Sequence, residues 1–109
     1  MDESRYQQLA DVALRTIEGM FEDVDADDVD VERAGDVVTL TFKNGKKAVV
    51  NTQRPTHQIW LAAHARAWHF SFDEKSGAWL DDKGQGVELL GQIAAIVKEQ
   101  ANVDVGTAR

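Results

Sequence analysis

The sequence predicts an α+β two-layer sandwich, in which an N-terminal and a C-terminal helix pack on one face of an antiparallel sheet of about six strands. Three observations support this fold class. Apolar residues recur at helical spacing near the two ends of the chain but alternate with polar residues in the middle. Short turns join the alternating segments, which favours antiparallel pairing. The length of 109 residues fits a single domain over positions 1–109, with an ordered part from about 4 to 102.

The first predicted helix covers residues 4–22. Ser4 followed by Gln7 has the spacing of a capping box, which is typical of a helix start. The apolar residues that follow recur every three or four positions, so we expect one side of this helix to be buried. These residues are Tyr6, Leu9, Ala13, Ile17 and Met20.

The middle of the chain predicts strands from its period-two alternation and its turn residues. Asn44-Gly45 is typical of a tight hairpin turn, and Pro55 ends a strand because it cannot donate to the hydrogen-bond ladder. The predicted strands are 28–32, 37–42, 47–53, 57–62, 67–72 and 78–81. A second amphipathic helix then carries Val87, Leu90, Ile93, Ala94, Val97 and Ala101 on its buried side.

The overall charge restricts the classes of partner. The chain has 19 acidic and 12 basic residues, a net charge of −7, which disfavours nucleic acid and anionic membranes and favours cations and basic protein surfaces. There is no cysteine, which excludes disulfides, thiolate metal sites and a cysteine nucleophile. The N-terminal residues lack the pattern of a signal peptide, and no apolar run reaches the ~18 residues of a membrane span. We therefore expect a cytoplasmic protein.

Acidic residues are concentrated where the first helix gives way to the first strand. Eight of the 19 acids lie between positions 18 and 32, and no Lys or Arg lies between Arg15 and Arg33. Anions at a helix C-terminus oppose the macrodipole by ~0.3–1 kcal/mol each, so this arrangement works against stability. We call residues 18–32 the acidic segment; its acids are Glu18, Glu22, Asp23, Asp25, Asp27, Asp28, Asp30 and Glu32. A solvated surface, a metal site and a docking face are all compatible with it.

The acidic segment does not match a calcium loop. Asp23, Asp25 and Asp27 occupy the first three ligand positions of an EF-hand, but the sixth position is Asp28 instead of Gly and the twelfth is Ala34 instead of Glu. Exposed carboxylates without convergent geometry form a surface of hard oxygen ligands for Fe, Mn, Ca or Mg. Such a surface binds metal weakly and with little selectivity.

Other motifs give no evidence for catalysis. His57, His64 and His69 lack the spacing of di-iron or zinc motifs, and we assign them ordinary surface or partly buried roles. The serines have no nucleophile-elbow context, and Gly84-Gln85-Gly86 lacks the rest of a phosphate-binding fingerprint. We therefore predict no catalytic residues and do not expect an enzyme.

A polar patch with one tryptophan is predicted on the open face of the sheet. Asn51 and Gln53 lie two apart on a strand, so their amides share one side. On the next predicted strand, Ile59 and Leu61 share one side. Gln58 and Trp60 share the other side. If those apolar residues face the helices, Trp60 is exposed beside amide groups, which is a common composition of protein interfaces.

In combination, these features resemble the bacterial frataxin family. One segment is the helix LADVALRTIEGMFED running into an Asp-rich strand. The second is VTLTFKNGKKAVVNTQRPTHQIWLA, which looks like the family signature Asn-x-Gln-x-Pro-x-x-Gln-Ile-Trp-Leu. The third is the WHF strand and the W-L-D hairpin before the closing helix. The resemblance covers about residues 4–102, and the central signature is its most specific part.

The resemblance implies an accessory protein of iron–sulfur cluster assembly that binds ferrous and ferric iron weakly and docks on the cysteine desulfurase and its scaffold protein. The resemblance also implies that the protein slows cluster formation when the iron concentration is high, as bacterial members of the family do. Carried over by position, the implied metal ligands are Glu18, Glu22, Asp23, Asp25, Asp27, Asp28 and Asp30. The implied partner-binding residues are Glu18, Glu22, Asp23, Asn51, Gln53, Gln58 and Trp60. We expect a monomer, with iron-dependent oligomers as a further state.

One position departs from the family pattern. Gly19 stands where many bacterial members have a second adjacent Glu, which removes one carboxylate and weakens the helix locally. Two alternative functions remain open. In the first, the chain is a stand-alone iron buffer or ferroxidase, and the acidic segment is the whole function. In the second, it is a metal-independent acidic interaction domain, such as a mimic of nucleic acid that occupies a basic site.

Overall fold

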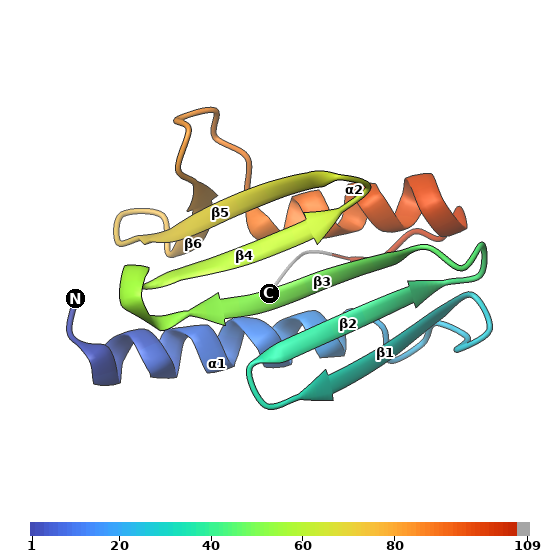
Figure 1. Ribbon diagram of the computed structural model, residues 1–109, viewed down its shortest axis with the longest axis horizontal. Helices are drawn as coiled ribbons and strands as arrows, with labels where there is room; N and C mark the ends of the chain where they lie inside the picture. The colour runs from blue at the N-terminus through green and yellow to red at the C-terminus, as the bar shows by residue number, and fades with distance from the viewer. Residues whose placement is uncertain (107–109) are drawn as a thin grey trace.

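The structure is a computed structural model that describes residues 1–106, and it places two helices on one six-stranded antiparallel sheet (Figure 1). The strands lie side by side in sequence order, so each pairs with its neighbours along the chain. The elements are α1 Glu3–Gly19, β1 Val29–Ala34, β2 Val37–Phe42, β3 Lys47–Gln53, β4 Gln58–Ala63, β5 Arg66–Asp73, β6 Ala78–Asp81 and α2 Leu89–Ala101. This arrangement confirms the predicted fold class. Among the described residues, neither helix is long and apolar enough to cross a membrane.

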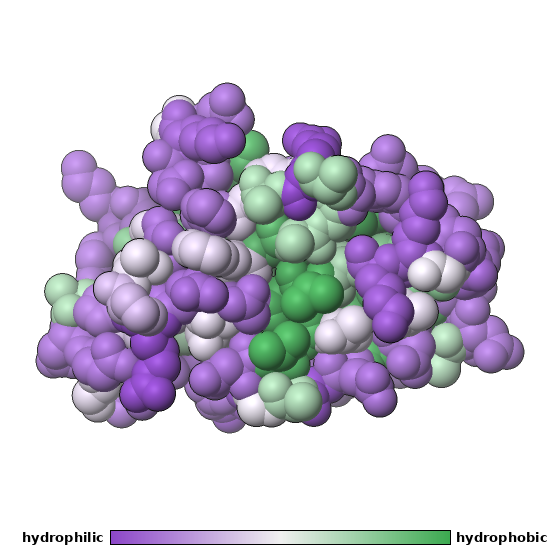
Figure 2. Space-filling view, viewed as in Figure 1, coloured by the Kyte–Doolittle hydropathy of each residue, from purple (hydrophilic) through white to green (hydrophobic). Residues whose placement is uncertain are grey.

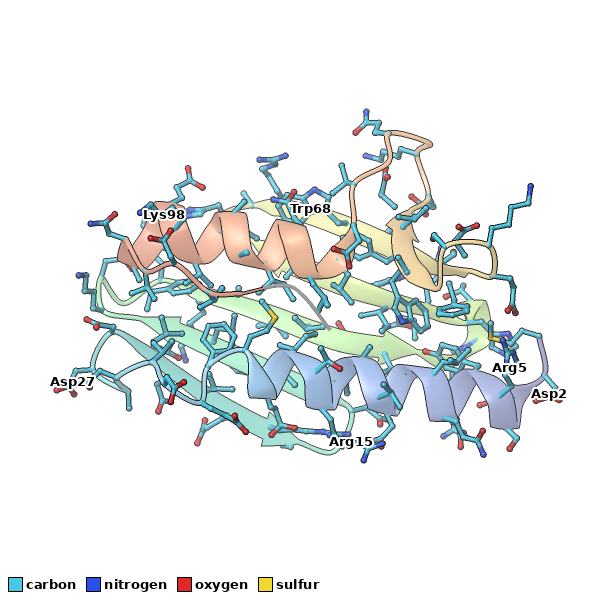
Figure 3. The ribbon with its side chains drawn as sticks, turned by 180° about the vertical axis from the view of Figure 1, so that it is seen from behind. Asp2, Arg5, Arg15, Asp27, Trp68 and Lys98 are labelled. Atoms are coloured by element: carbon cyan, nitrogen blue, oxygen red, sulfur yellow. The ribbon has the colours of Figure 1, made fainter. Side chains whose placement is uncertain are left out.

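The core lies between the helices and the side of the sheet that they cover. Figure 3, seen from behind, shows α1 and α2 side by side in front of the strands. The fully buried side chains come from both layers: Tyr6, Leu14, Ile17, Leu89, Ile93 and Val97 from the helices, and Val38, Leu40, Val50, Ile59, Leu61 and Phe70 from the strands. Burying one aliphatic or Phe side chain stabilises the fold by about 1.5–3 kcal/mol, so this one layer supplies most of the driving force.

Tyr6 fastens α1 to the turn between β3 and β4. Its hydroxyl donates to the carbonyl of Gln58 at 2.7 Å and accepts the amide N–H of Gln53 at 3.1 Å. The ring also stacks on His57, with ring centroids 4.8 Å apart. A short 3-10 helix, Arg54–Thr56, contains Pro55 and makes the turn. One phenol therefore fixes the two strand ends from which Gln53 and Gln58 project.

The boundaries of α1 differ from those predicted. The N-cap is Asp2 instead of Ser4: its Oδ1 accepts the amide N–H of Arg5 at 2.8 Å. A carboxylate is the stronger cap because it also meets the positive end of the helix dipole. The helix ends at Gly19, where low helix propensity coincides with acids that oppose the dipole. Glu22 and Asp23 consequently lie in a turn after the helix.

Two smaller predictions, on the buried side of α2 and the start of β4, were also wrong. On α2, Leu89 and Ile96 are buried in addition to the predicted Ile93, Val97 and Ala101, whereas Leu90 and Ala94 are only partly buried. This shift follows from the N-cap, Glu88, which starts the helix with Leu89 already directed inward. Finally, His57 does not belong to β4; it has φ +54° at the end of the 3-10 helix.

The β4–β5 hairpin turns through two residues that are not glycine. Register pairs Ala63 with Arg66, which leaves only His64 and Ala65 in the loop. Their φ angles are +55° and +59°. Two successive positive φ angles define a turn that Asn-Gly fits well, whereas an L-residue with a Cβ is strained there by about 1–2 kcal/mol.

The double substitution His64→Asn with Ala65→Gly should raise the free energy of unfolding by about 0.5–1 kcal/mol, because relief of strain exceeds the extra unfolded-chain entropy of glycine. Urea unfolding followed by circular dichroism measures the change. The matched control is the β2–β3 turn, where Gly45 already has φ +86°, so that Gly45→Ala should lower stability. A double variant no more stable than the parent would show that this turn is not strained.

Candidate functional site

The helices leave one face of the sheet open (Figure 1). Strand register and burial place the predicted amide and tryptophan residues on that face. Ile59 is fully buried while Trp60 is only partly buried, as the alternation predicted. The β3–β4 register places Asn51 opposite Trp60 and Gln53 opposite Gln58. These four residues therefore occupy two adjacent cross-strand pairs, and we call them the amide–tryptophan patch.

Trp60 is held in position by its neighbours on this face. Its indole Nε1–H donates to Oε1 of Gln58 at 2.9 Å. The ring stacks on His69 across the β4–β5 pair, with centroids 4.2 Å apart and an angle of 21° between the planes. His69 Nδ1 in turn lies 3.5 Å from a carboxylate oxygen of Asp82. The partly buried role predicted for His69 agrees with its burial, but its contact with Trp60 was missed. That contact follows from strand register.

A row of small apolar residues crosses the same face beside the patch. Register pairs Val49 with Ala62 and Ala62 with Ala67 across three strands. Figure 2, which views this face, shows a hydrophobic band across the middle of the sheet between hydrophilic areas. The open face therefore combines an apolar centre with polar groups and an indole, as protein interfaces commonly do. This row was not predicted from the sequence.

The acidic segment is divided between the two sides of β1 and does not form one continuous surface. Asp30 and Glu32 pair with Thr41 and Thr39 on the open face of the sheet. Glu18 lies on α1, on the side that the helices cover. Between them, the turn after α1 presents exposed carboxylates, and Figure 3 shows Asp27 at the far end of the molecule, pointing into solvent.

Arg33 forms an ion pair with Glu18, the only acid of the acidic segment that lies on α1. It follows Val31 on the helix-facing side of β1 and reaches back to α1. Its Nη2 lies 2.7 Å from Oδ1 of Asp11, and its Nη1 lies 3.3 Å from Oε1 of Glu18. Nε donates to the carbonyl of Gly35 at 2.9 Å. Glu18, an implied metal ligand, therefore already has a cationic partner.

The hydrogen bond between Arg33 and Asp11 favours the charged form of each. It lowers the pKa of the Asp11 carboxyl and raises the pKa of the Arg33 guanidinium. The Arg33 side chain is only 22% exposed, against 47% for Asp11. An arginine at a core-facing position of a strand is itself a sequence signal, because a charge placed there needs partners. The position of Arg33 therefore held a signal that did not enter the predicted site.

The remaining implied ligands do not form a preformed metal cage. Asp28 lies 3.9 Å from Lys43 Nζ. Within residues 1–106, no cationic side chain lies within 4.0 Å of the other implied ligands, Glu22, Asp23, Asp25, Asp27 and Asp30. In the same described part of the chain, no three His, Asp or Glu side chains are placed to hold one metal ion.

An open groove of about 460 Å³ lies beside the turn after α1. It separates the end of α1 from the segment that follows α2. The residues that line it are Gly19, Met20, Asp23, Val24, Asp25, Asp28, Val103, Asp104, Val105 and Gly106. Asp25 is partly committed to the turn itself, because its Oδ1 accepts the amide N–H of Asp27 at 2.8 Å.

The pair of Asp11 and Arg33 should make stability depend on pH. The pKa of Asp11 lies below its ordinary value of 3.8 in the folded chain. A group with a lowered folded pKa adds stability above its unfolded pKa, and that contribution is lost as pH falls through the folded pKa. The stability difference between the parent and Asp11→Asn should therefore stay constant above about pH 5 and shrink below about pH 4.

Urea unfolding at a series of pH values measures this difference. The control is Glu99→Gln, which removes an exposed carboxyl from α2, away from Arg33, and should show no such loss. If the effect of Asp11→Asn persisted undiminished at the acid end of the series, the ion pair would not be its source.

Comparison with known proteins identifies the family. The model of the Frataxin-like domain matches residues 1–103. The chain is 38% identical to the iron-sulfur cluster assembly protein CyaY of Pseudomonas fluorescens, over 94% of this chain and 92% of that protein. It is also 38% identical to the protein of the same name from Pseudoalteromonas atlantica, over 100% of this chain and 97% of that protein.

Two solved structures agree with this match. Frataxin from Psychromonas ingrahamii superposes with a TM-score of 0.90 at 34% identity and covers 100% of both chains. Trimeric frataxin from the yeast Saccharomyces cerevisiae, complexed with ferrous iron, superposes with a TM-score of 0.68 at 26% identity, over 94% of this chain and 88% of that one. The family model, the sequence identities and the shared fold agree. The chain therefore belongs to the frataxin-like family, among relatives named for iron–sulfur cluster assembly.

Proposed function

We propose that the chain is a non-enzymatic, iron-responsive accessory protein of cytoplasmic iron–sulfur cluster assembly that docks on the cysteine desulfurase. Its relatives named for cluster assembly, and the yeast frataxin solved with ferrous iron, support this proposal. One observation carries it: the turn after α1 gathers Glu22, Asp23, Asp25 and Asp27 on exposed positions, with no described cation within 4.0 Å.

These carboxylates are suited to attracting a basic surface. Grouped like charges repel one another in the free protein, and a basic partner relieves that repulsion. Complementary charges of this kind raise association rates, and salt screens them. The net charge of −7 acts in the same direction at longer range. A basic patch on the cysteine desulfurase is therefore the partner we assign to the turn.

Iron is a reversible ligand in this proposal and not a resident cofactor. Carboxylate oxygens suit ferrous and ferric ions. Because no three described side chains converge on one point, binding is weak and the ion exchanges easily. An ion on the turn cancels part of the charge that attracts the desulfurase. Iron and partner then draw on the same carboxylates, so docking responds to iron concentration.

The open face of the sheet supplies a second contact in this proposal. The amide–tryptophan patch offers hydrogen-bonding groups around an indole fixed by Gln58 and His69. The neighbouring row of Val49, Ala62 and Ala67 offers apolar area. An indole fixed before binding loses little entropy on contact, which is why such residues often dominate binding energy. We assign this face to the scaffold protein or to the desulfurase that carries it.

Reversing charge on the turn should weaken docking. Glu22→Lys with Asp27→Lys avoids Asp25, whose side chain supports the turn backbone. We expect affinity for purified cysteine desulfurase to fall by about tenfold or more, and parent binding to weaken as ionic strength rises from ~0.01 to ~1 M. Calorimetry measures both effects. The control, Asp36→Lys with Glu99→Lys, makes the same change in net charge on other elements and should bind nearly as the parent does. Equal loss in both variants would exclude a specific role for the turn.

Truncating the indole should weaken docking without unfolding the chain. Trp60→Ala removes a partly buried ring from the open face, and we expect affinity for the desulfurase–scaffold complex to fall by about tenfold. The control is Trp68→Ala, since Trp68 lies on the opposite face, beside α2 (Figure 3). Thermal unfolding of both variants separates binding from stability. Unchanged affinity in a folded Trp60→Ala variant would remove this face from the docking surface.

Anaerobic titration of Fe²⁺ into isotope-labelled protein, repeated with the desulfurase, tests the proposal as a whole. Amide shifts confined to the acidic segment in both titrations are the expected result. Iron shifts without any response to the desulfurase would favour a stand-alone iron buffer. A response to the desulfurase without any response to iron would favour a metal-independent acidic interaction domain.

A further inference from the structure

We infer that Arg33 is a built-in counter-ion that withdraws Glu18 from the cation-binding surface of this chain. The surface open to cations is then the turn of residues 22–28 and not the helix before it. The inference rests on the proposed iron binding and deepens it, because it states which carboxylates of the acidic segment meet the ion.

The geometry fixes the guanidinium firmly. Arg33 projects from the helix-facing side of β1, an edge strand, and its Nε–H is bound by the carbonyl of Gly35. The other two nitrogens reach carboxylates two turns apart along α1, Asp11 at 2.7 Å and Glu18 at 3.3 Å. Each nitrogen of the planar group therefore has an acceptor. A guanidinium with three fixed partners leaves one of them at a greater cost than a mobile surface lysine would.

Burial strengthens the effect of this pair on cations. The Arg33 side chain is only 22% exposed. Water and salt therefore screen its charge less than they screen the exposed carboxylates of the acidic segment. A divalent ion approaching Glu18 must displace the guanidinium or bind beside a fixed positive charge, and either route weakens binding. The contact of Lys43 with Asp28 is looser, at 3.9 Å between side chains that are 53% and 41% exposed.

The helical acids are neutralised as a group. Asp11 is bonded on its other oxygen by Arg15, at 3.0 Å. Two carboxylates and two cationic side chains thus balance on this side of α1 and β1. The turn that follows has four carboxylates without such partners among the described residues, at Glu22, Asp23, Asp25 and Asp27. Adjacent stretches of sequence with similar acid content therefore present different electrostatic surfaces.

Paramagnetic line broadening by Mn²⁺ alone tests the inference. In the parent, amides of residues 22–28 should broaden first and the amide of Glu18 should broaden less. In Arg33→Gln, broadening should spread to Glu18 and Asp11, and Mn²⁺ affinity should rise about threefold or more. The matched control is Arg15→Gln, which removes one positive charge from the same helix surface but leaves Arg33 on Glu18. It should not produce the spread.

Two further variants separate charge from structure. Arg33→Lys keeps a cation near Glu18 and should largely restore the parent pattern, which a merely structural role of Arg33 would not explain. Adding Glu18→Gln to Arg33→Gln should abolish the gain at the helix. Circular dichroism checks that each variant is folded, and a destabilised Arg33→Gln leaves the Arg33→Lys comparison as the decisive one.

The outcomes distinguish the inference from the proposed function. Strong broadening of Glu18 in the parent, or the same spread in Arg15→Gln as in Arg33→Gln, would overturn the inference and leave iron binding intact. A parent turn that does not broaden, with a gain at Glu18 only in Arg33→Gln, would overturn the proposed iron surface while the role of Arg33 stands. No broadening in any variant would overturn both.

Discussion

The burial of one face of a single sheet is the constraint on which the other features depend. Strand side chains alternate with a period of two, so directing Ile59 and Leu61 at the helices forces Trp60 outward. A slip of one residue would bury the indole and expose the aliphatic side chains, at a cost of several kcal/mol. Tyr6 holds the register by bonding both ends of the β3–β4 turn. The amide–tryptophan patch is therefore a consequence of how the core packs.

The same alternation distributes the charges. On β1 it places Asp30 and Glu32 on the open face and Arg33 under α1. An arginine at this position would be costly without acceptors, and Asp11 and Glu18 supply them from the facing helix. Ion pairing within the fold and charge left for partners are thus determined together by one strand. In the turn before β1, Glu22, Asp23, Asp25 and Asp27 make no such contact with any described side chain, and their charges stay exposed.

Local patterns predicted most of the fold, while contacts between distant residues were missed. Alternation and Asn44-Gly45 located all six strands, because both act within a few residues. The start of α1 was misplaced since two neighbouring residues can cap a helix, and only the structure shows that Asp2 does so. The stack of Trp60 on His69 depends on strand register. Arg33 ended the acid run in the sequence, yet in the fold it lies against the first acid of that run.

The order of the strands also bears on how the domain forms during synthesis. Every strand pairs with its neighbour in sequence, so the sheet can grow hairpin by hairpin with short loops to close. Its helix-facing side, however, needs both helices, and α2 is made after all six strands. Until α2 has been translated, the apolar side chains of the sheet that it covers remain exposed. Apolar surface exposed in this way makes an incomplete chain prone to self-association through that face until α2 packs on it.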